Sequence, residues 1–302
     1  SRPPAPPSSG EAAAADAAAG CAPMEAVPAR RPAEPRLPTA DFEIPFATLS
    51  LGSLIGQGAF GKVYAGKWRG TSVAVKMLAC THMTDDIIDE FRREVAVLSS
   101  LRHPNIVLFM GAVTTPPHSL VTELVSRGSL WAVLHSDLEL PWAVRLHMAR
   151  DIARGMAFLH SATPPLLHRD LKSGNILVDD AFNTKLTDFG LARVKASIQT
   201  MTGNMGTFQW MAPEVLGNQR YTEKADVFSF AIVMWELVTR RCPYESMNQI
   251  QMAMAVLNHG MREVIPPDVN PRYAALIARS WDANPDARPG FLDILEELDA
   301  IA

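Results

Sequence analysis

The chain has 302 residues, of which 48% are hydrophobic, and a formal net charge of −4 at pH 7. A chain of this size and composition can bury a large core without metals or disulfides, so one large domain or two lobes are expected. The slightly negative charge provides no basic field of the kind that a phosphate backbone attracts, and nucleic acid is not expected as a partner.

Cysteines and apolar stretches indicate the compartment. The three cysteines, Cys21, Cys80 and Cys242, are too far apart for a CxxC pair or a metal-ligand cluster, which favours a reducing, cytoplasmic location. The longest strongly apolar stretch, residues 228–238, contains Glu236 and is far shorter than the roughly 20 residues that span a bilayer. No membrane span is therefore expected.

The first 40 residues differ in composition from the rest. They contain nine of the 23 prolines, long alanine runs and no aromatic residue. Such a segment cannot bury enough apolar surface to offset the entropy of ordering it. We predict a disordered tail at residues 1–48, followed by a domain at residues 49–302.

From residue 49 onward, short segments rich in β-branched and aromatic residues alternate with glycines, which predicts antiparallel strands. Apolar residues at three- and four-residue intervals predict one amphipathic helix at residues 85–101. After about residue 127 the periodicity is mostly helical, as in residues 142–160, 225–238 and 274–281. The pattern predicts an α+β fold with a strand-rich first lobe and a mainly helical second lobe.

A glycine-rich loop lies near the start of the predicted sheet. Glycines allow the backbone to approach a ligand, and exposed N–H groups of such a loop can bind phosphate oxygens. A dinucleotide-binding fold requires a helix directly after the last glycine, whereas residues 62–68 are typical of a strand. A glycine-rich hairpin without a ligand stays open at this point. The loop residues are Gly56, Gln57, Gly58, Ala59, Phe60 and Gly61.

Residues 72–77 are predicted to form a strand, and Lys76 lies on its inner face. The period of two places Ala74 and Lys76 on the same face as the glycine-rich loop. A buried ammonium requires a negative partner, and Glu94 on the apolar side of the predicted helix is the candidate. The pair would direct the ammonium toward ATP phosphates. The alternative is that Lys76 reaches solvent and Glu94 lies at the helix boundary.

Two further segments concentrate polar groups of unlike chemistry. Asp170, Lys172 and Asn175 lie within six positions, and Asp188 precedes Phe189 and Gly190. Phosphoryl transfer requires an in-line nucleophile, Mg²⁺ and cations that face the developing charge, and these residues are of the right chemical types. For any one of these acids, a solvated loop carboxylate is the competing interpretation.

In this order and spacing, the motifs resemble those of the eukaryotic protein kinase family. The resemblance covers about 250 residues and implies that Lys76 and Glu94 form an activating ion pair. It also implies that Asp170 orients the substrate hydroxyl and that Asn175 and Asp188 hold Mg²⁺. The matching segments are Gly56 to Val63, Val73 to Lys76, Glu94, His168 to Asn175, Asp188-Phe189-Gly190, Ala212-Pro213-Glu214, Asp226 and Arg288.

The same resemblance implies an ATP site. Thr122 would be the gatekeeper before a hinge at residues 123–125, whose backbone, at Glu123 and Val125, would bind the adenine edge. Glu214 would pair with Arg288 in the second lobe. The residues expected to enclose adenine are Ile55, Val63, Ala74 and Leu177.

Lys172 and Thr207 are similar to the residues of Ser/Thr kinases, and residues 101–112 and 210–214 resemble the Raf-like branch of the tyrosine-kinase-like group, including plant and algal members. The resemblance thus implies transfer of the ATP γ-phosphate to a protein Ser or Thr hydroxyl. A tyrosine or dual-specificity kinase and a nucleotide-binding pseudokinase scaffold stay open.

A phosphate on a residue between Asp188 and Glu214 could pair with Arg169 and order that loop, after autophosphorylation or the action of an upstream kinase. The candidates are Ser197, Thr200 and Thr202.

Overall fold

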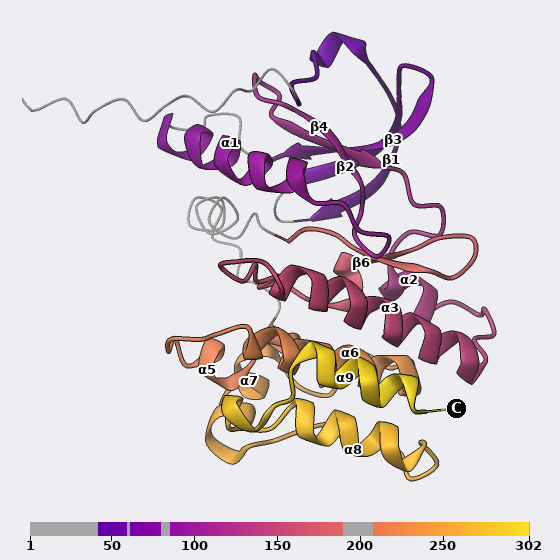
Figure 1. Cartoon of the computed structure of the whole chain (residues 1–302), viewed down its shortest axis with the longest axis vertical. Coiled ribbons are helices and arrows are strands. Elements are labelled where there is room, and N and C mark those ends of the chain that lie inside the picture. Colours follow the sequence, from indigo (N-terminus) through magenta and orange to yellow (C-terminus); the bar gives the residue numbers. More distant parts are fainter. Residues whose placement is uncertain (1–41, 59–60, 80–84, 190–207, 302) are drawn as a thin grey trace, which may run out of the picture. The chain divides into compact units, whose positions relative to one another are not determined.

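A computed structural model of the chain describes residues 42–58, 61–79, 85–189 and 208–301. The first part of this region is an antiparallel sheet in the order β1-β2-β3-β5-β4, with α1 (Asp85–Ser100) packed beside β4 (Figure 1). The predicted strand-rich part with its amphipathic helix is confirmed. The strands are β1 (Leu49–Gly58), β2 (Gly61–Trp68), β3 (Thr71–Leu78), β4 (Phe109–Val113) and β5 (Ser119–Glu123).

The two faces of β3 have different environments, as its alternating sequence predicts. Val73 and Val75 are fully buried and pack with Val121 in a small core on one face. Ala74 and Lys76 lie on the opposite face, where they line a cavity. The sheet therefore carries Lys76 on a rigid strand whose other face is anchored in apolar packing.

A short segment before β1 is part of this sheet. Phe42 and Ile44 are buried, and residues 42–44 exchange two backbone hydrogen bonds of 2.8 Å with Ala112 on β4. Glu43 accepts a further bond from the N–H of Thr114. The predicted tail at residues 1–48 is therefore too long, because its last residues contain two large apolar side chains that the sheet buries. Residues 1–41 lie outside the described residues.

This docking predicts a measurable stability effect. Ile44→Ala is expected to lower the free energy of unfolding by about 2–5 kcal/mol, because it removes a fully buried side chain and leaves a cavity. Urea denaturation followed by circular dichroism measures the change. Ile250→Ala is the matched control, since Ile250 is 64% exposed. Equal effects of the two substitutions would contradict the docking.

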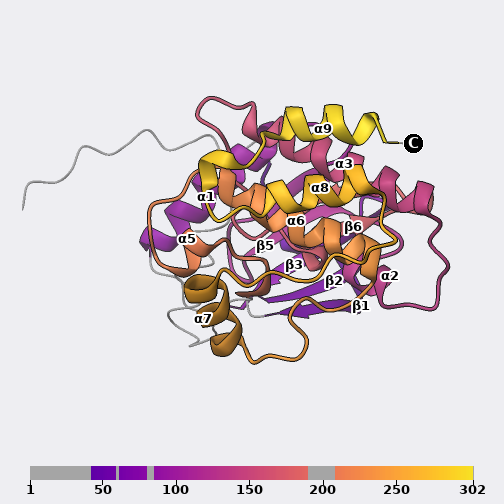
Figure 2. The same cartoon turned by 90° about the horizontal axis from the view of Figure 1, so that it is seen from below.

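The second part of the chain is mainly helical, as predicted, and includes the hairpin of β6 (Ile176–Val178) and β7 (Thr184–Leu186). Figure 2 shows α3, α6, α8 and α9 running together as one group. The helices are α2 (Leu130–Leu134), α3 (Trp142–His160), α5 (Pro213–Leu216), α6 (Lys224–Thr239), α7 (Gln249–His259), α8 (Pro271–Ser280) and α9 (Phe291–Asp299).

Helix α6 is the centre of the helical core. Every residue at positions 225–237 is buried, and the helix packs against α3 and α8. A helix that is apolar on nearly all sides is stable only when surrounded by protein. The acidic residues of this helix, Asp226 and Glu236, are therefore held in the interior, where each must find hydrogen-bond donors.

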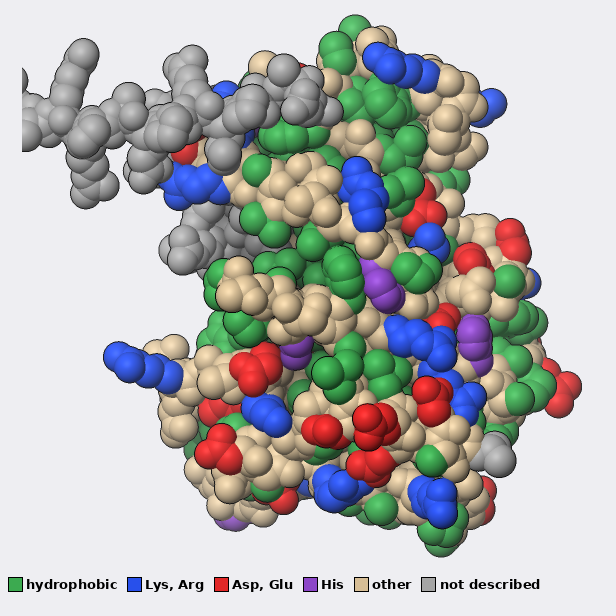
Figure 3. Space-filling view, in the orientation of Figure 1, with side chains coloured by type: hydrophobic (Ala, Val, Ile, Leu, Met, Phe, Trp, Pro, Cys, Tyr) green, Lys and Arg blue, Asp and Glu red, His purple; other side chains and the backbone are tan. Residues whose placement is uncertain are grey.

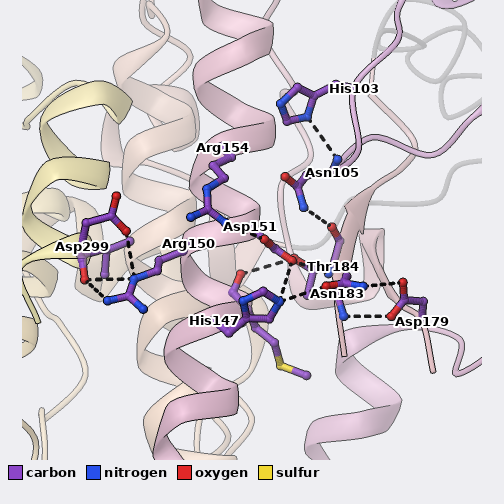
Figure 4. Close-up of polar contacts among 12 residues, drawn as sticks. His103, Asn105, His147, Arg150, Asp151, Arg154, Asp179, Asn183, Thr184 and Asp299 are labelled. Atoms are coloured by element: carbon purple, nitrogen blue, oxygen red, sulfur yellow. Dashed lines mark hydrogen bonds and ion pairs between the residues drawn. The ribbon is translucent and has the colours of Figure 1, made fainter. Parts of the chain in front are cut away.

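A polar network fixes the β6–β7 hairpin to α3 (Figure 4). The buried carboxylate of Asp151 accepts hydrogen bonds from the N–H of Thr184 and from Arg154, each at 3.1 Å, and lies 3.4 Å from His147. Asn105 donates to the carbonyl of Thr184 at 3.1 Å and accepts from the N–H of Leu186 through its own carbonyl. The hairpin is held from both sides, which fixes the residues at its two ends.

Candidate active site

A cavity of about 570 Å³ lies between the sheet and the β6–β7 hairpin. This volume is within the range of small-molecule sites, about 300–1,000 Å³. Its lining includes ten of the predicted site residues: Ile55, Gly56, Gln57, Val63, Ala74, Lys76, Thr122, Val125, Leu177 and Asp188. Apolar residues that the sequence analysis did not assign complete the wall: Ala65, Leu98, Ile106, Val107, Phe109, Leu120, Leu124 and Phe189.

The glycine-rich loop is the turn between β1 and β2. Gly58 pairs with Gly61 across the two strands, and β2 begins directly at Gly61, so no helix follows the loop. Gly61 has φ 144°, and a Cβ there would lie 1.9 Å from the carbonyl oxygen of Met77. Only glycine fits this position. Ala59 and Phe60 lie outside the described residues, and Gly58 and Gly61 do not line the cavity.

Lys76 and Asp188 meet inside the cavity. The Nζ atom of Lys76 lies 2.5 Å from Oδ2 of Asp188, and these side chains are only 15% and 22% exposed. Asp188 has φ 64°, a conformation that costs a non-glycine residue about 1–3 kcal/mol and that is enriched at active sites. The side chain of Glu94, the predicted partner of Lys76, lies outside the described residues, so the predicted ion pair with Glu94 stays a prediction.

The segment from Asp170 to Asn175 forms a second cluster. Asn175 Nδ2 donates to the Asp170 carbonyl at 2.7 Å and to Oδ2 of the Asp170 side chain at 2.9 Å. The Nζ atom of Lys172 lies 3.2 Å from Oδ1 of the same carboxylate. Both oxygens of Asp170 are thus held in one orientation, next to a cation.

The two clusters are adjacent. The N–H of Thr187, the residue before Asp188, donates to the carbonyl of Asn175 at 3.0 Å. This bond closes the base of the hairpin and brings together residues that are 12 positions apart in the sequence. The structure therefore places Lys76, Asp188, Asn175 and Asp170 in one continuous polar region beside the cavity.

Asp226 holds the start of this loop. Its Oδ2 and Oδ1 atoms accept hydrogen bonds of 2.9 Å from the backbone N–H groups of His168 and Arg169, and Oδ2 lies 2.9 Å from His160. Arg169 has φ 66°, so the carboxylate stabilises a strained backbone. Asp226 belongs to the motifs that match the family, but no role was predicted for it. Its position in an otherwise apolar helix was the available signal.

The ring of His168 packs edge-on against Phe189, with 5.9 Å between the ring centroids. This contact packs His168 against the residue that directly follows Asp188. Gly190 and the candidate phosphorylation sites Ser197, Thr200 and Thr202 lie outside the described residues, so their role stays a prediction.

Glu123 is the predicted hinge residue whose side chain does not line the cavity. Its carboxylate accepts hydrogen bonds of 2.8 and 3.0 Å from Lys185 on β7, and Oε1 also accepts from the N–H of Leu108 at 2.8 Å. Only the backbone of Glu123 can therefore serve adenine, as the hinge prediction requires.

A buried ion pair lies further from the cavity. Arg288 donates to both oxygens of Glu214 at 2.7 and 2.9 Å, and the two side chains are 0% and 7% exposed. Two backbone carbonyls, those of Asp282 and Lys224, accept its remaining bonds at 2.8 and 2.9 Å. The pair joins α5 to the segment before α9, as the family resemblance implies.

The residues fit a magnesium nucleotide. Asn175 uses its amide nitrogen in both hydrogen bonds to Asp170, so its amide oxygen is the atom that can ligate a cation. Among the described residues, no group of three or more His, Cys, Asp or Glu could hold a metal ion. Mg²⁺ needs no such group, because it is usually held by one or two protein oxygens together with phosphates and water.

Comparison with known proteins identifies the family. Residues 49–298 match the model described as protein tyrosine and serine/threonine kinase. The chain therefore belongs to this family, as its motifs predicted.

Within the described part of the chain, no helix combines the length and apolar character needed to cross a bilayer.

Several curated kinases are similar to the chain. The probable serine/threonine-protein kinase drkD of Dictyostelium discoideum is 47% identical over 265 residues, which cover 86% of this chain and 20% of that protein. The serine/threonine-protein kinase CTR1 of Arabidopsis thaliana is 45% identical over 288 residues, which cover 92% of this chain and 35% of that protein. The probable serine/threonine-protein kinase SIS8 of Arabidopsis thaliana is 46% identical over 262 residues, which cover 86% of this chain and 25% of that protein. The chain thus spans between a fifth and about a third of the length of these relatives. Their similarity confirms the predicted Raf-like Ser/Thr branch.

Proposed function

We propose that the chain is the catalytic domain of a protein Ser/Thr kinase that transfers the γ-phosphate of ATP to a hydroxyl group of a protein substrate. The observation that carries this proposal is the convergence of Lys76 and Asp188 in one cavity, with Asp170 and Asn175 beside them. The Ser/Thr specificity is supported by the relatives and by Lys172 next to Asp170.

Each residue has a chemical role in this proposal. The apolar walls at Ile55, Val63, Ala74 and Leu177 would hold adenine, and the backbone at residues 123–125 would bind its edge. Lys76 would neutralise phosphate oxygens, and Asp170 would accept a hydrogen bond from the substrate hydroxyl and orient it for attack. Lys172 would face the charge that develops on the transferred group.

Mg²⁺ bound by Asn175 and Asp188 would neutralise the β- and γ-phosphates. The Lys76–Asp188 contact supports this proposal, because it holds a cation and an anion together in the cavity. Because phosphoryl transfer depends mostly on positioning and electrostatics, this arrangement needs no covalent intermediate on the protein.

The proposed kinase domain occupies residues 49–302, with lobes at residues 49–125 and 126–302, and residues 42–44 extend the sheet of its first lobe. Autophosphorylation or an upstream kinase would act on Ser197, Thr200 or Thr202. A cytoplasmic location is supported by the three widely separated cysteines. Nucleic acid is not proposed as a partner, since basic and acidic side chains are interspersed on the face in Figure 3.

A labelled-ATP assay on generic protein substrates tests the proposal. We expect Mg²⁺-dependent transfer, with phosphoserine and phosphothreonine in the hydrolysed product. Phosphotyrosine in the product would support the tyrosine or dual-specificity alternative. Binding of Mg·ATP without transfer would support a pseudokinase scaffold, although Lys76, Asp170 and Asp188 are all present.

A further inference from the structure

Helix α6 contains a second buried carboxylate that the proposed chemistry does not use. Glu236 is 0% exposed and lies in a stretch where its helix neighbours are apolar. Each of its oxygens has one hydrogen-bond donor. Ser173 Oγ donates to Oε1 at 2.6 Å, and Trp210 Nε1 donates to Oε2 at 2.7 Å.

These two donors belong to different functional segments. Ser173 is fully buried, directly follows Lys172 and lies two residues before Asn175. Trp210 ends the short turn Phe208–Trp210, and its carbonyl accepts a bond of 2.7 Å from Ser229 on α6. One carboxyl group therefore links the loop that carries Asp170 to the segment that follows residues 190–207.

A group this deep in the core is costly to keep. Burial raises the pKa of Glu236 to about 8, and the bonds from Ser173 and Trp210 offset only part of that effect. Apolar residues of similar volume would pack in this helix without the cost of desolvating a carboxyl group. Buried acids with strongly shifted pKa values gather at functional sites, and this one bonds directly to Ser173 in the catalytic loop, the segment from His168 to Asn175 that carries Asp170.

We propose that Glu236 is a positioning residue for phosphoryl transfer, which sets the catalytic loop through Ser173 and the neighbouring segment 208–212 through Trp210. Because Glu236 contacts both, it fixes this segment relative to the loop that carries Asp170. A shift of about 1 Å in such a group can cost about 10²-fold in rate. This inference rests on the proposed kinase activity.

The role differs from that of Asp226. Asp226 holds the loop by two backbone N–H groups at its start, whereas Glu236 holds it by the side chain of Ser173 near its end. Helix α6 thus anchors the loop at two points ten residues apart on the same helix. Loss of the second anchor is expected to change the position of Lys172 and Asn175 while the fold persists.

Four variants of the full chain separate the two contacts. Glu236→Gln keeps one hydrogen bond to each neighbour, because its amide oxygen accepts from Trp210 and its N–H donates to Ser173. Glu236→Leu removes both bonds at similar volume. Ser173→Ala removes only the loop contact, and Trp210→Phe removes only the N–H donor.

We expect kcat to fall about 10- to 10²-fold in Glu236→Leu and about 10-fold in Ser173→Ala, with the KM for ATP unchanged, since none of these residues lines the cavity. Trp210→Phe is expected to raise mainly the KM for the protein substrate. Glu236→Gln should retain activity within about threefold. Adding Ser173→Ala to Glu236→Leu should lower kcat no further, because the two act through one bond.

Ser280→Ala is the matched control for Ser173→Ala. Both serines are fully buried, but the hydroxyl of Ser280 has no hydrogen-bond partner within the described part of the chain. The kcat of the Ser280→Ala variant should equal that of the wild type. Thermal melts establish that each variant is folded, and if Glu236→Leu is not, Ser173→Ala and Trp210→Phe decide the question.

Wild-type kcat in folded Glu236→Leu overturns the inference and leaves the proposed kinase activity intact. Wild-type kcat in Ser173→Ala together with a wild-type KM for the protein substrate in Trp210→Phe does the same. An equal loss in Glu236→Gln and Glu236→Leu overturns it as well, because hydrogen-bond geometry would then not be the cause. Absence of phosphoryl transfer by the wild-type chain instead contradicts the proposed function itself.

Discussion

Asp170→Asn lowers kcat for phosphoryl transfer by at least about 10²-fold, because it removes the carboxylate that orients the hydroxyl and accepts its proton. The native carboxylate is held by Asn175 at 2.9 Å and by Lys172 at 3.2 Å. Asn preserves the size of the side chain but not its negative charge. The KM for ATP should change little, since Asp170 does not line the cavity.

A labelled-ATP assay on the wild type and the variant measures this effect. Asp180→Asn provides the control, because it makes the same chemical change on the exposed turn of the β6–β7 hairpin. That variant should keep wild-type kcat. A loss of kcat below about threefold in Asp170→Asn would contradict the role of Asp170 in orienting the hydroxyl. Equal losses of kcat in both variants would indicate a general effect of charge.

Arg288→Ala is expected to lower the free energy of unfolding by about 3–5 kcal/mol, because it leaves the carboxylate of Glu214 buried without its cation. The guanidinium is 0% exposed and forms hydrogen bonds to both Glu214 oxygens and to two backbone carbonyls. The size of the effect reflects the cost of the unpaired charge, not the net stabilisation by the pair. Urea denaturation at pH 7 measures it.

Arg279→Ala is the matched control on the surface. Arg279 pairs with Glu297, and their side chains are 51% and 37% exposed. Exposed pairs contribute about 0–1 kcal/mol. In addition, Arg288→Met combined with Glu214→Leu should recover part of the lost stability, because neither charge remains buried. Comparable losses in Arg288→Ala and Arg279→Ala would refute the explanation.

The main elements could be predicted because their signals are local. The apolar period at residues 142–160 corresponds to α3, and the alternation around Lys76 matches the two faces of β3. Side-chain periods of 3.6 and 2.0 follow from backbone geometry alone. The end of the tail was wrong because the alternation of Phe42 and Ile44 is too short to predict a strand, and their burial depends on a strand more than 60 residues away.

The candidate residues could be predicted from their chemistry, but their partners could not. Lys76 meets Asp188 across 112 positions, and Ser173 meets Glu236 across 63. Glu236 was visible in the sequence as a lone acid in an apolar stretch, although nothing local indicated its two donors. Glu123 was predicted for the hinge, and only the structure shows its carboxylate facing Lys185.

The amino-acid sequence alone determined the family, the strand-rich and helical parts of the chain and the residue types available for phosphoryl transfer, because motifs and periodicity are properties of short segments. The tertiary structure decided which of those residues meet. Contacts between distant segments depend on how α6, α3 and the sheet pack, and a carboxylate such as Glu236 acquires its donors and its raised pKa only when that packing removes it from water.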